Sequence, residues 1–303
     1  MELEFKPVVA GDIDRLRPFY GMRPNKTCDS VFLDSFLWKD YYHVQCAVSE
    51  GRAALWLMEK DGQVSTAMPL CREEDLPYFF QQMVDYFSEV LHKPFYISLA
   101  DEEAVQCLNL DPALFEVEEQ VDLKDYLYSG EELRKLEGKK FVKKRNHLNG
   151  FKRTYEGRYE YRRLCCSDRH EVWQFMERWR QHREEVGAME LSLDYEVAGI
   201  HDILKNCSSL YVRMAGVYID GQLEAFTIGS LNVRENMAVI HIEKANPEIR
   251  GLYQFINQQF LINEFPQAEL VNREDDVGME GLRKAKMSYC PIGFARKYMV
   301  RER

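Results

Sequence analysis

Residues 268–291 concentrate the side-chain types that acyl transfer requires. An apolar pair, Leu270–Val271, is followed at once by five polar residues: Asn272, Arg273, Glu274, Asp275 and Asp276. A carboxylate can accept the proton of an attacking amine, and a cation can stabilise the oxyanion that forms. Because loops at strand ends carry function, the run predicts an active-site loop. A charged surface turn is the alternative interpretation.

Two sets of candidate residues lie in and near this loop. Those that could exchange a proton during catalysis are Glu243, Glu274, Lys286 and Tyr289. Those that could hold the acceptor or the oxyanion through an amide, a guanidinium or a carboxylate are Asn272, Arg273, Asp275 and Arg283. Simple ion pairing of Glu274 and Arg273, with each other or with Lys286, is the competing explanation.

A basic segment lies in the middle of the chain. Its cationic residues are Lys139, Lys140, Lys143, Lys144, Arg145, Lys152 and Arg153. No acidic residue occurs between Glu137 and Glu156, although the whole chain has a net charge of −10. Such a patch suits the phosphates of a nucleic acid, and an acidic lipid surface would attract it as well. A solvated helix face is the alternative.

Patterns for other chemistries are missing from the sequence. It has no G-x-S-x-G motif, and its seven histidines form no H-x-x-x-H pair. His241 lies on the polar side of a predicted strand and is interpreted as a structural histidine. The eight cysteines show neither C-x-x-C nor zinc-site spacing, so we expect no metal site. The pair Cys165–Cys166 is predicted to lie buried on a strand.

Composition narrows the class of protein. The 303 residues are 46% hydrophobic, which is enough for a substantial core, and the pI is about 5.4. A globally acidic chain has no general attraction for nucleic acid, so any such binding needs a local basic patch. The start of the sequence has no apolar signal core, and no apolar run has the length of a membrane span. We therefore expect a cytoplasmic protein with free thiols.

Two similar segments indicate tandem organisation. Residues 53–70 and 212–230 each contain an apolar run, then Asp-Gly-Gln, then an alternating strand pattern. The dipeptides Asp61–Gly62 and Asp220–Gly221 are typical of two-residue hairpin turns. We predict two related domains, residues 1–125 and 126–303.

The predicted elements of the second half begin with a helix whose apolar face is Val172, Phe175, Met176, Trp179 and Val186, interpreted as core packing. The later elements are a helix at 194–205, strands at 209–219, 222–231 and 237–243, a helix at 251–264, a strand at 268–271, a short helix and a strand at 294–300. In the first half we predict helices at 74–91 and 101–108 and strands at 95–99 and 114–121. The aromatic stretch 36–42 could line a pocket or pack in the core.

This order of elements resembles that of a GNAT acyltransferase domain. Two such domains in tandem resemble the Fem-type peptidoglycan aminoacyltransferases and the C-terminal domain of bacterial phosphatidylglycerol lysyltransferases. The segments that carry the likeness are LEGKKFVKKRNHLNGFKRTY (136–155), PEIRGLYQFIN (247–257) and GLRKAKMSYCPIGFARKYMV (281–300). The resemblance implies an α+β fold with a mixed sheet and two GNAT-like domains, of which the first is degenerate. The chain departs from the lysyltransferases at Gly293–Phe294–Ala295, where they carry a Trp-Glu pair, and in lacking an integral-membrane domain.

The resemblance also assigns expected roles. In the GNAT fold the helix after the fourth strand starts at a phosphate site, where free N–H groups and the helix dipole meet an anion. Arg250, Gly251 and Leu252 would then bind the donor's phosphate, although they match the acetyl-CoA pattern poorly. Glycine as a simple helix-start residue is the alternative. Glu243 ends the fourth strand, where some GNAT enzymes place their base.

The expected function is transfer of an acyl or aminoacyl group to an amine or hydroxyl acceptor. Because of the basic segment and the poor CoA motif, aminoacyl-tRNA is favoured as the donor over acyl-CoA. A CoA-dependent N-acetyltransferase acting on a small metabolite and a non-catalytic RNA- or nucleotide-binding module are the alternatives. We expect no tightly bound cofactor. The expected partners are tRNA and a small-molecule or lipid-headgroup acceptor.

Overall fold

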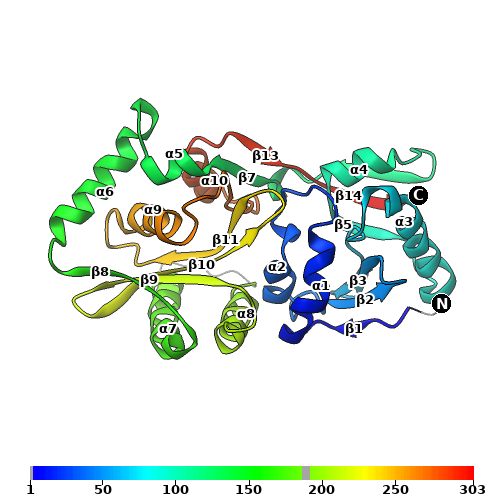
Figure 1. The fold of residues 1–303 in the computed structure, drawn as a ribbon, viewed down its shortest axis with the longest axis horizontal. Helices are drawn as coiled ribbons and strands as arrows, with labels where there is room; N and C mark the ends of the chain where they lie inside the picture. The colour runs from blue at the N-terminus through cyan, green and yellow to red at the C-terminus, as the bar shows by residue number, and fades with distance from the viewer. Residues whose placement is uncertain (1–2, 186–191) are drawn as a thin grey trace.

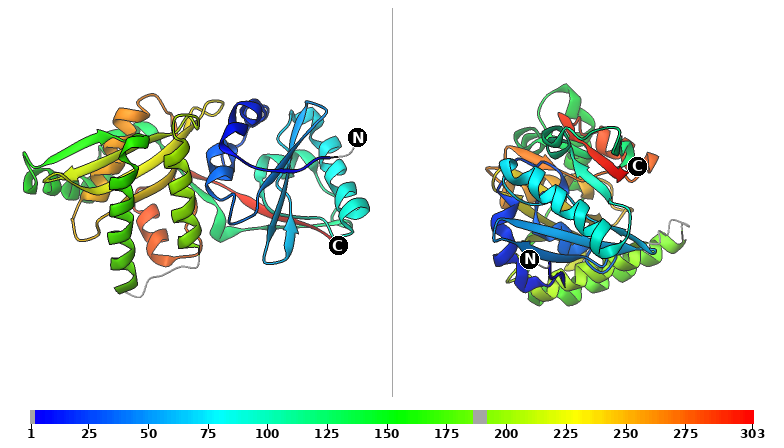
Figure 2. Two further views of the ribbon diagram at one scale, coloured as in Figure 1. Left: turned by 90° about the horizontal axis from the view of Figure 1, so that it is seen from below. Right: turned by 90° about the vertical axis from the view of Figure 1, so that its right-hand side faces the viewer.

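The computed structural model describes residues 3–185 and 192–303 and combines helices with three β-sheets (Figure 1). The sheets have the strand orders β1-β2-β3-β4, β13-β7-β12-β11-β10-β9-β8 and β5-β14-β6. The views in Figures 1 and 2 show an elongated molecule with the chain's two ends close together at one end.

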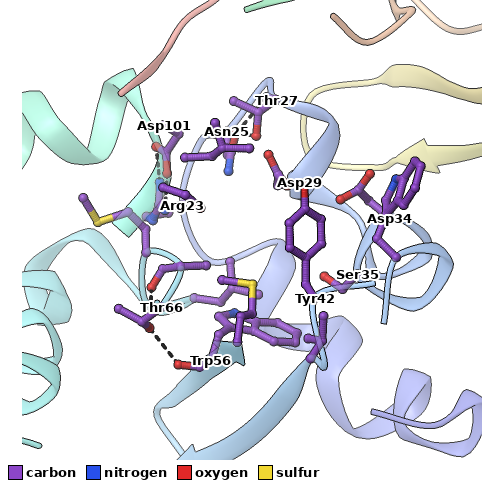
Figure 3. Close-up of a pocket in the computed structure, with 18 residues that line it drawn as sticks. Arg23, Asn25, Thr27, Asp29, Asp34, Ser35, Tyr42, Trp56, Thr66 and Asp101 are labelled. Atoms are coloured by element: carbon purple, nitrogen blue, oxygen red, sulfur yellow. Dashed lines mark hydrogen bonds and ion pairs between the residues drawn. The ribbon is translucent and has the colours of Figure 1, made fainter. Parts of the chain in front are cut away.

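The first half contributes β1 (Lys6–Pro7), α1 (Ile13–Tyr20), α2 (Phe32–Leu37), β2 (Gln45–Ser49), β3 (Ala53–Lys60), β4 (Gln63–Ser65), α3 (Leu76–Asp85), β5 (Tyr96–Asp101), α4 (Glu102–Leu108) and β6 (Phe115–Glu119). Short helical turns are η1 (Ala10–Asp12), η2 (Cys28–Ser30), η3 (Glu73–Asp75), η4 (Tyr86–Leu91) and η5 (Val121–Leu123). Residues of α2, β3 and β5 enclose a small pocket (Figure 3).

The second half contributes β7 (Asp125–Ser129), α5 (Gly130–Lys135), α6 (Val142–Thr154), β8 (Tyr159–Arg163), α7 (Arg169–Glu185), α8 (Leu193–Asn206), β9 (Arg213–Ile219), β10 (Gln222–Asn232), β11 (Met237–Ala245), α9 (Leu252–Glu264), β12 (Leu270–Asn272), α10 (Glu280–Met287), β13 (Gly293–Ala295) and β14 (Lys297–Glu302). Two further turns are η6 (Lys139–Phe141) and η7 (Cys166–Asp168).

Both predicted hairpins are confirmed. β3 pairs with β4 and β9 pairs with β10, each antiparallel across its Asp-Gly turn. Asp61 and Asp220 have φ values of 52° and 51°, the positive backbone angle that the tightest hairpin turns require. The matching turns fit the predicted tandem organisation.

The seven-stranded sheet forms the centre of the second half. α9 and α6 lie on one side of it and α7 and α8 on the other (Figure 1). β11 and β12 are parallel neighbours, and their pairing runs only from Met237 opposite Leu270 to Val239 opposite Asn272. β11 then continues to Ala245 while the chain leaves β12, so the two strands part at their carboxyl ends. In open sheets ligands bind in the crevice beyond such strand ends.

The end of the chain returns to the first half. One strand was predicted at 294–300, but the structure has two: β13 pairs with β7 in the seven-stranded sheet, and β14 pairs with β5 and β6. β7 begins at Asp125, at the predicted boundary, and joins the second half's sheet. The division into residues 1–125 and 126–303 stays a prediction.

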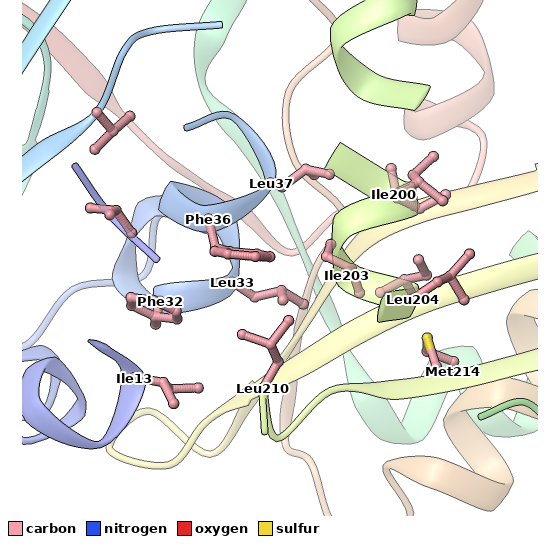
Figure 4. Packing of buried hydrophobic residues seen from close by; sticks show 14 of the residues in the cluster. Ile13, Phe32, Leu33, Phe36, Leu37, Ile200, Ile203, Leu204, Leu210 and Met214 are labelled. Carbon is pink, nitrogen blue, oxygen red and sulfur yellow. The ribbon is translucent and has the colours of Figure 1, made fainter. Parts of the chain in front are cut away.

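A hydrophobic cluster joins the two halves. Phe32, Leu33, Phe36 and Leu37 of α2 meet Ile200, Ile203 and Leu204 of α8 (Figure 4). The predicted core face of α7 is confirmed for Val172, Phe175 and Met176, with Trp179 packed against the cluster at its edge. Val186 lies outside the described residues.

A glycine permits the close contact between α2 and α8. A Cβ atom added to Gly199 would lie 2.2 Å from the backbone oxygen of Leu37, which is too close for any side chain. We expect Gly199→Ala to lower the free energy of unfolding by about 3 kcal/mol, because the two helices must move apart. Gly150, inside α6, has open space at its Cβ position. Gly150→Ala should therefore raise stability by about 0.5–1 kcal/mol through helix propensity. Urea unfolding measures the free energy of unfolding of both variants. If Gly199→Ala changes it no differently from Gly150→Ala, the close contact between α2 and α8 does not require a glycine.

The expectation of free thiols was wrong for two cysteines. Cys166 and Cys207 form a disulfide that links η7 to the end of α8. The predicted buried strand at Cys165–Cys166 is also wrong, since Cys165 is exposed and Cys166 begins a helical turn. Only Cys28, Cys46 and Cys71 are free and buried among the described cysteines. Sequence spacing missed the bridge because its partners are brought together by packing of α7 and α8.

Candidate active site

A cavity of about 840 Å³ lies where β11 and β12 part. Its second-half walls come from β11, the start of α9, the loop after β12 and α10. Its first-half walls come from the segments around Cys28, Asp34–Tyr42 and Leu99. The predicted active-site loop therefore borders a real cavity, and this cavity lies between the two halves of the chain. Of the aromatic stretch 36–42, Trp38, Tyr41 and Tyr42 line it and Phe36 packs in the core.

Asn272 anchors the loop and does not line the cavity. Its side-chain nitrogen donates to the Lys26 carbonyl (2.8 Å) and to Asp125 Oδ2 (3.0 Å), and its oxygen accepts from the Glu274 N–H (2.7 Å). The residue is completely buried. These bonds turn the chain at Glu274, whose φ is 56°. The acceptor role predicted for Asn272 would thus be indirect, through the position of the loop.

Glu243 and Arg273 form an ion pair on the cavity wall. Arg273 Nη2 lies 2.8 Å from Glu243 Oε1, and Asn257 donates to Glu243 Oε2 at 2.8 Å. The Arg273 guanidinium also lies 4.7 Å from the centre of the Tyr289 ring. Burial alone would lower the pKa of Arg273, but Glu243 raises it, so the guanidinium stays charged. Its Nη1 atom has no hydrogen-bond partner among the described residues.

His241 occupies a bulge in β11. The register changes from Ile228 opposite Ile242 to Gly229 opposite Ile240, which leaves His241 as the extra residue. Bulges often re-aim a side chain beside an active site. His241 Nε2 lies 2.8 Å from Ser230 Oγ, and Nδ1 lies 2.9 Å from Glu274 Oε1.

Burial shifts the pKa values of His241 and Glu274 in opposite directions. Burial lowers the pKa of His241 to about 3, so the ring is neutral at physiological pH. Burial raises the pKa of Glu274 well above its ordinary value, opposed by the charge of Lys286. Carboxyl groups with raised pKa values are suited to proton transfer near neutral pH. Glu274 is one of the residues predicted from the sequence, whereas the contact of His241 with it is not, since a bulge leaves no signal in the hydrophobic pattern.

Lys286 fastens the loop to α10. Its Nζ donates to the carbonyls of Arg273 (2.6 Å) and Asp275. Burial lowers its pKa, while Glu274 opposes that shift. The side chain also lines the cavity. Tyr289 lines it too, and burial raises the pKa of its hydroxyl to about 12.

Arg283 lies outside the cavity wall and pairs with Asp276. Its Nη2 lies 2.9 Å from Asp276 Oδ1 and 2.6 Å from Asp122 Oδ1. Asp276 Oδ2 also accepts from the Tyr126 hydroxyl at 2.5 Å. The side chain of Asp276 is only 3% exposed. The acceptor role predicted for Arg283 is therefore not supported by direct access to the cavity.

The Asp276 carboxylate should make the free energy of unfolding depend on pH. Hydrogen bonds from Arg283 are the main cause that lowers its pKa to about 2. A lowered folded-state pKa stabilises the protein above the unfolded value of about 4, and this contribution disappears as pH falls from about 4 to about 2. We expect Asp276→Asn to cost about 2 kcal/mol at pH 7 and nothing at pH 2. Urea titrations at several pH values test this, with Glu280→Gln on the exposed side of α10 as a neutral control. If Asp276→Asn lowers the free energy of unfolding equally at pH 7 and pH 2, the lowered pKa of Asp276 is not the source of its stabilising effect.

The start of α9 packs against α6. Gly251 has a φ of 90°, and a Cβ atom there would lie 2.3 Å from the His147 carbonyl and 2.9 Å from Phe151. The contact with α6 explains this glycine without any phosphate. Arg250 is exposed and its Nε lies 3.4 Å from His147 Nδ1, and Leu252 is buried in the core. The donor-phosphate role of Arg250, Gly251 and Leu252 stays a prediction.

The predicted basic segment forms η6 and α6. Lys139, Lys143 and Arg153 are exposed and form no ion pair with an acidic side chain in the part of the chain that the structure describes, whereas Lys140 pairs with Glu132. Arg145 is structural, because it donates to the carbonyls of Leu136 and Gly138. Lys152 lies 5.9 Å from the centre of the Phe255 ring.

Lys144 connects this segment with the cavity. It lines the cavity wall, donates to Ser288 Oγ at 2.6 Å and lies 3.8 Å from the centre of the Tyr289 ring. Burial lowers its pKa to about 8. We call the cations of η6 and α6 the basic face, and Lys144 is the residue of this segment that lines the cavity.

An acidic cluster from distant segments lies at the cavity floor. Lys297 Nζ lies 2.8 Å from Asp125 Oδ1, 3.1 Å from the Cys28 sulfur and 3.7 Å from carboxylate oxygens of Asp29 and Asp275. Burial alone would lower the pKa of Lys297, but Asp125 and the neighbouring groups raise it well above its ordinary value. No sequence spacing predicted this cluster, because only folding brings its residues together.

One group of this region has the residue types of a metal site. Ligand atoms of Cys28, Asp34 and Glu274 lie within 4.8 Å of one another. The Lys297 ammonium already contacts the Cys28 sulfur, and burial raises the pKa of that thiol well above its ordinary value. The raised pKa disfavours the thiolate that a soft metal ion needs. The Lys297 ammonium favours that thiolate, but its positive charge at the sulfur repels a metal cation. The arrangement does not fit a metal centre well.

Residues 23–301 match the family described as phosphatidylglycerol lysyltransferase, C-terminal. The chain belongs to this family, and the resemblance found in its sequence is confirmed. An uncharacterized protein of Mycoplasmoides gallisepticum is 28% identical over 178 residues, which are 58% of this chain and 56% of that protein. The match therefore spans little more than half of that relative's length.

Solved structures have the same fold. A conserved Bacteroides thetaiotaomicron protein of unknown function has a TM-score of 0.90 at 27% identity, with complete coverage of both chains. The L-PGS structure of Bacillus licheniformis has a TM-score of 0.69 at 15% identity, covering 99% of this chain and 94% of that one. FemX has a TM-score of 0.62 at 11% identity, covering 98% and 96%. The fold is that of tandem GNAT-like acyltransferases, as predicted.

Within the described residues, no helix combines the length and the apolar character needed to cross a lipid bilayer. The cytoplasmic location stays a prediction.

Proposed function

We propose that this protein transfers an aminoacyl group from aminoacyl-tRNA to an amine or hydroxyl acceptor in the cavity beyond β11 and β12. One observation carries the proposal: a carboxyl with a raised pKa, Glu274, and a buried guanidinium, Arg273, border the same cavity. Acyl transfer needs a proton acceptor and a positive group for the oxyanion, and both occur here. Family membership supports the same class of reaction.

In this reaction the acceptor's nitrogen or oxygen attacks the ester carbonyl carbon of the donor. Glu274 accepts the acceptor's proton, and the neutral His241 ring holds that carboxyl in place. Arg273, whose side chain lines the cavity, stabilises the oxyanion through its positive charge. The ester bond to the ribose then breaks, and Tyr289, which stays protonated because of its raised pKa, gives a proton to the leaving oxygen. No covalent enzyme intermediate is needed.

Glu243 has a different part in this scheme. Arg273 and Asn257 occupy both of its carboxylate oxygens. A carboxylate bound in this way orients the guanidinium and accepts no further proton easily. We therefore assign Glu243 to positioning Arg273, and Lys286 and Asn272 to holding the loop.

The basic face favours tRNA as the donor carrier. Three exposed cations, Lys139, Lys143 and Arg153, lie on η6 and α6, and Lys144 of the same helix lines the cavity. The packing of Gly251 on α6 accounts for this glycine whether or not a CoA pyrophosphate binds beside it. Phosphate contacts of this kind give salt-sensitive binding.

The direct test is a transfer assay with charged tRNA and a panel of amine and hydroxyl acceptors. We expect loss of aminoacyl ester to require both protein and acceptor, and the product to carry the aminoacyl group. Lys139→Glu, Lys143→Glu and Arg153→Glu together should weaken tRNA binding at least tenfold. The same reversal at Lys6, Arg72 and Lys93, which are exposed in the first half, is the matched control.

The alternatives give different results in the same experiments. Acyl transfer from acetyl-CoA but not from charged tRNA would overturn the proposal in favour of a CoA-dependent N-acetyltransferase. Salt-sensitive RNA binding that ignores charging, with no turnover, would overturn it in favour of a binding module.

A further inference from the structure

A second, smaller cavity of about 90 Å³ lies in the first half beside the large one. Both cavities are lined by Asp29, Asp34, Trp38, Tyr42 and Leu99, so they adjoin at these residues. One water-sized group needs about 10–15 Å³ of such space, so the small cavity has room for roughly six. Nothing in the reaction scheme above uses it.

The walls of the small cavity are mostly apolar and aromatic. They include Trp38, Tyr42, Val44, Trp56, Met58, Met68 and Leu70. Figure 3 shows Tyr42 and Trp56 between two polar ends, with Asp29 and Asp34 at one end and Arg23 with Asp101 at the other. Aromatic faces attract organic cations as well as apolar chains.

The Arg23 end carries no net charge. Two guanidinium nitrogens of Arg23 each lie 2.6 Å from a carboxylate oxygen of Asp101, and both side chains are almost completely buried. The pair is therefore a neutral part of the wall.

The Asp34 end brings three carboxyl groups together, and burial raises the pKa of Asp34 well above its ordinary value. Asp34 is only 8% exposed, and no hydrogen bond or ion pair from a cationic group reaches its carboxyl within the described ranges 3–185 and 192–303. Its hydrogen-bonding neighbour is the carboxyl of Asp29, and an oxygen of Glu274 lies within 4.8 Å. Lys297 forms ion pairs with Asp125, Asp29 and Asp275 but not with Asp34, on which it acts only through its more distant charge. A buried carboxyl that faces two others needs a proton or a cation.

We propose that this cavity is a side pocket of the active site that binds the ammonium end of a short, unbranched organic amine. The ammonium group lies between Asp34, Asp29 and Glu274, and the carbon chain lies against Trp38, Tyr42 and Trp56. The size of the pocket excludes a lipid tail. The position of Asp34 beside Glu274 places the bound amine next to the proposed proton acceptor.

Two sources could supply this ammonium group. It could belong to the side chain of the transferred aminoacyl group, or to a small primary amine that acts as the acceptor. The assignment of a source rests on the proposed function, whereas binding of the amine itself does not.

The binding test uses n-butylamine and its neutral counterpart 1-butanol with the full-length protein. We expect n-butylamine to bind with a Kd on the order of millimolar and to raise the thermal midpoint in a saturable way, and 1-butanol to do neither. Asp34→Asn should weaken binding at least tenfold. Glu196→Gln is the matched control, since Glu196 is a carboxylate of the large cavity that already pairs with Lys244.

A second variant guards against indirect effects of Asp34→Asn. Ala67 lines the small cavity, and Ala67→Phe should fill it and abolish n-butylamine binding without removing any charge. Equal binding of amine and alcohol, or unchanged binding in both variants, would overturn the proposal. Stabilisation by Mg²⁺ or Mn²⁺ that is lost in Asp34→Asn, without stabilisation by the amine, would overturn it in favour of a metal site.

The transfer assay separates the two sources. An N-aminoacyl butylamide product identifies the pocket as the acceptor site. Inhibition of transfer by n-butylamine without its incorporation identifies it as the site for the donor's side chain. If no transfer occurs with any acceptor while specific amine binding persists, the proposed function fails and the pocket remains.

Discussion

Glu274→Gln is expected to lower the turnover of aminoacyl transfer by about 10²–10⁴-fold, the usual contribution of a positioned general base. Glutamine keeps the size of the side chain and can still bond to His241, but it cannot accept a proton. The affinity for tRNA should stay unchanged, because the basic face is formed by other residues. Single-turnover kinetics with saturating donor measure the effect directly.

Glu243 offers an internal control for this prediction. Glu243→Gln should retain the hydrogen bond with Arg273 while weakening the ion pair, so we expect a loss of only about tenfold, the effect of about 1.4 kcal/mol. Both variants should unfold at midpoints close to that of the parent protein. If Glu243→Gln abolishes transfer while Glu274→Gln retains it, the roles of the two carboxylates must be exchanged.

Lys297→Met is expected to lower the free energy of unfolding by about 3–5 kcal/mol, the usual cost of breaking a buried ion pair. Lys297 is 1% exposed and Asp125 is completely buried. Removal of the ammonium group would leave the Asp125 carboxylate without its ion-pair partner. Urea unfolding at neutral pH measures the loss.

Two further variants show whether the loss in Lys297→Met comes from the unpaired, buried charge of Asp125. Asp125→Asn in the Lys297→Met background removes the unpaired charge and should recover part of the loss. Arg301→Met, on the same strand, breaks the exposed ion pair with Glu116 and should cost at most about 1 kcal/mol. Equal losses for Lys297→Met and Arg301→Met would show that burial of the pair does not matter.

Much of the fold could be predicted because local signals agreed with it. The Asp-Gly dipeptides predicted both hairpins, and the hydrophobic periodicity predicted α7, α8 and α9 to within a few residues. Strand β14 could not be assigned in this way, since its pairing with β5 and β6 joins residues far apart in the sequence. Periodicity reports that a strand exists but not which sheet receives it.

The candidate site was predictable where its residues are consecutive. Arg273, Glu274 and Asp275 follow one strand and border one cavity, as expected. The contact of His241 with Glu274 was not predicted, because a bulge of one residue decides the direction of this side chain. Asp34 and Lys297 were missed because their chemistry depends on neighbours from other segments. The phosphate role of Gly251 stays a prediction, and the contact of Gly251 with α6 was not predicted.

The pairing of β14 between β5 and β6 has a consequence for synthesis on the ribosome. The first half's three-stranded sheet lacks its central strand until residues 297–302 have left the exit tunnel, after the whole second half. Until then the edges of β5 and β6 are unpaired and open to wrong partners. The first half therefore cannot finish folding before the second half has been made, although all four strands of its β1–β4 sheet leave the ribosome early.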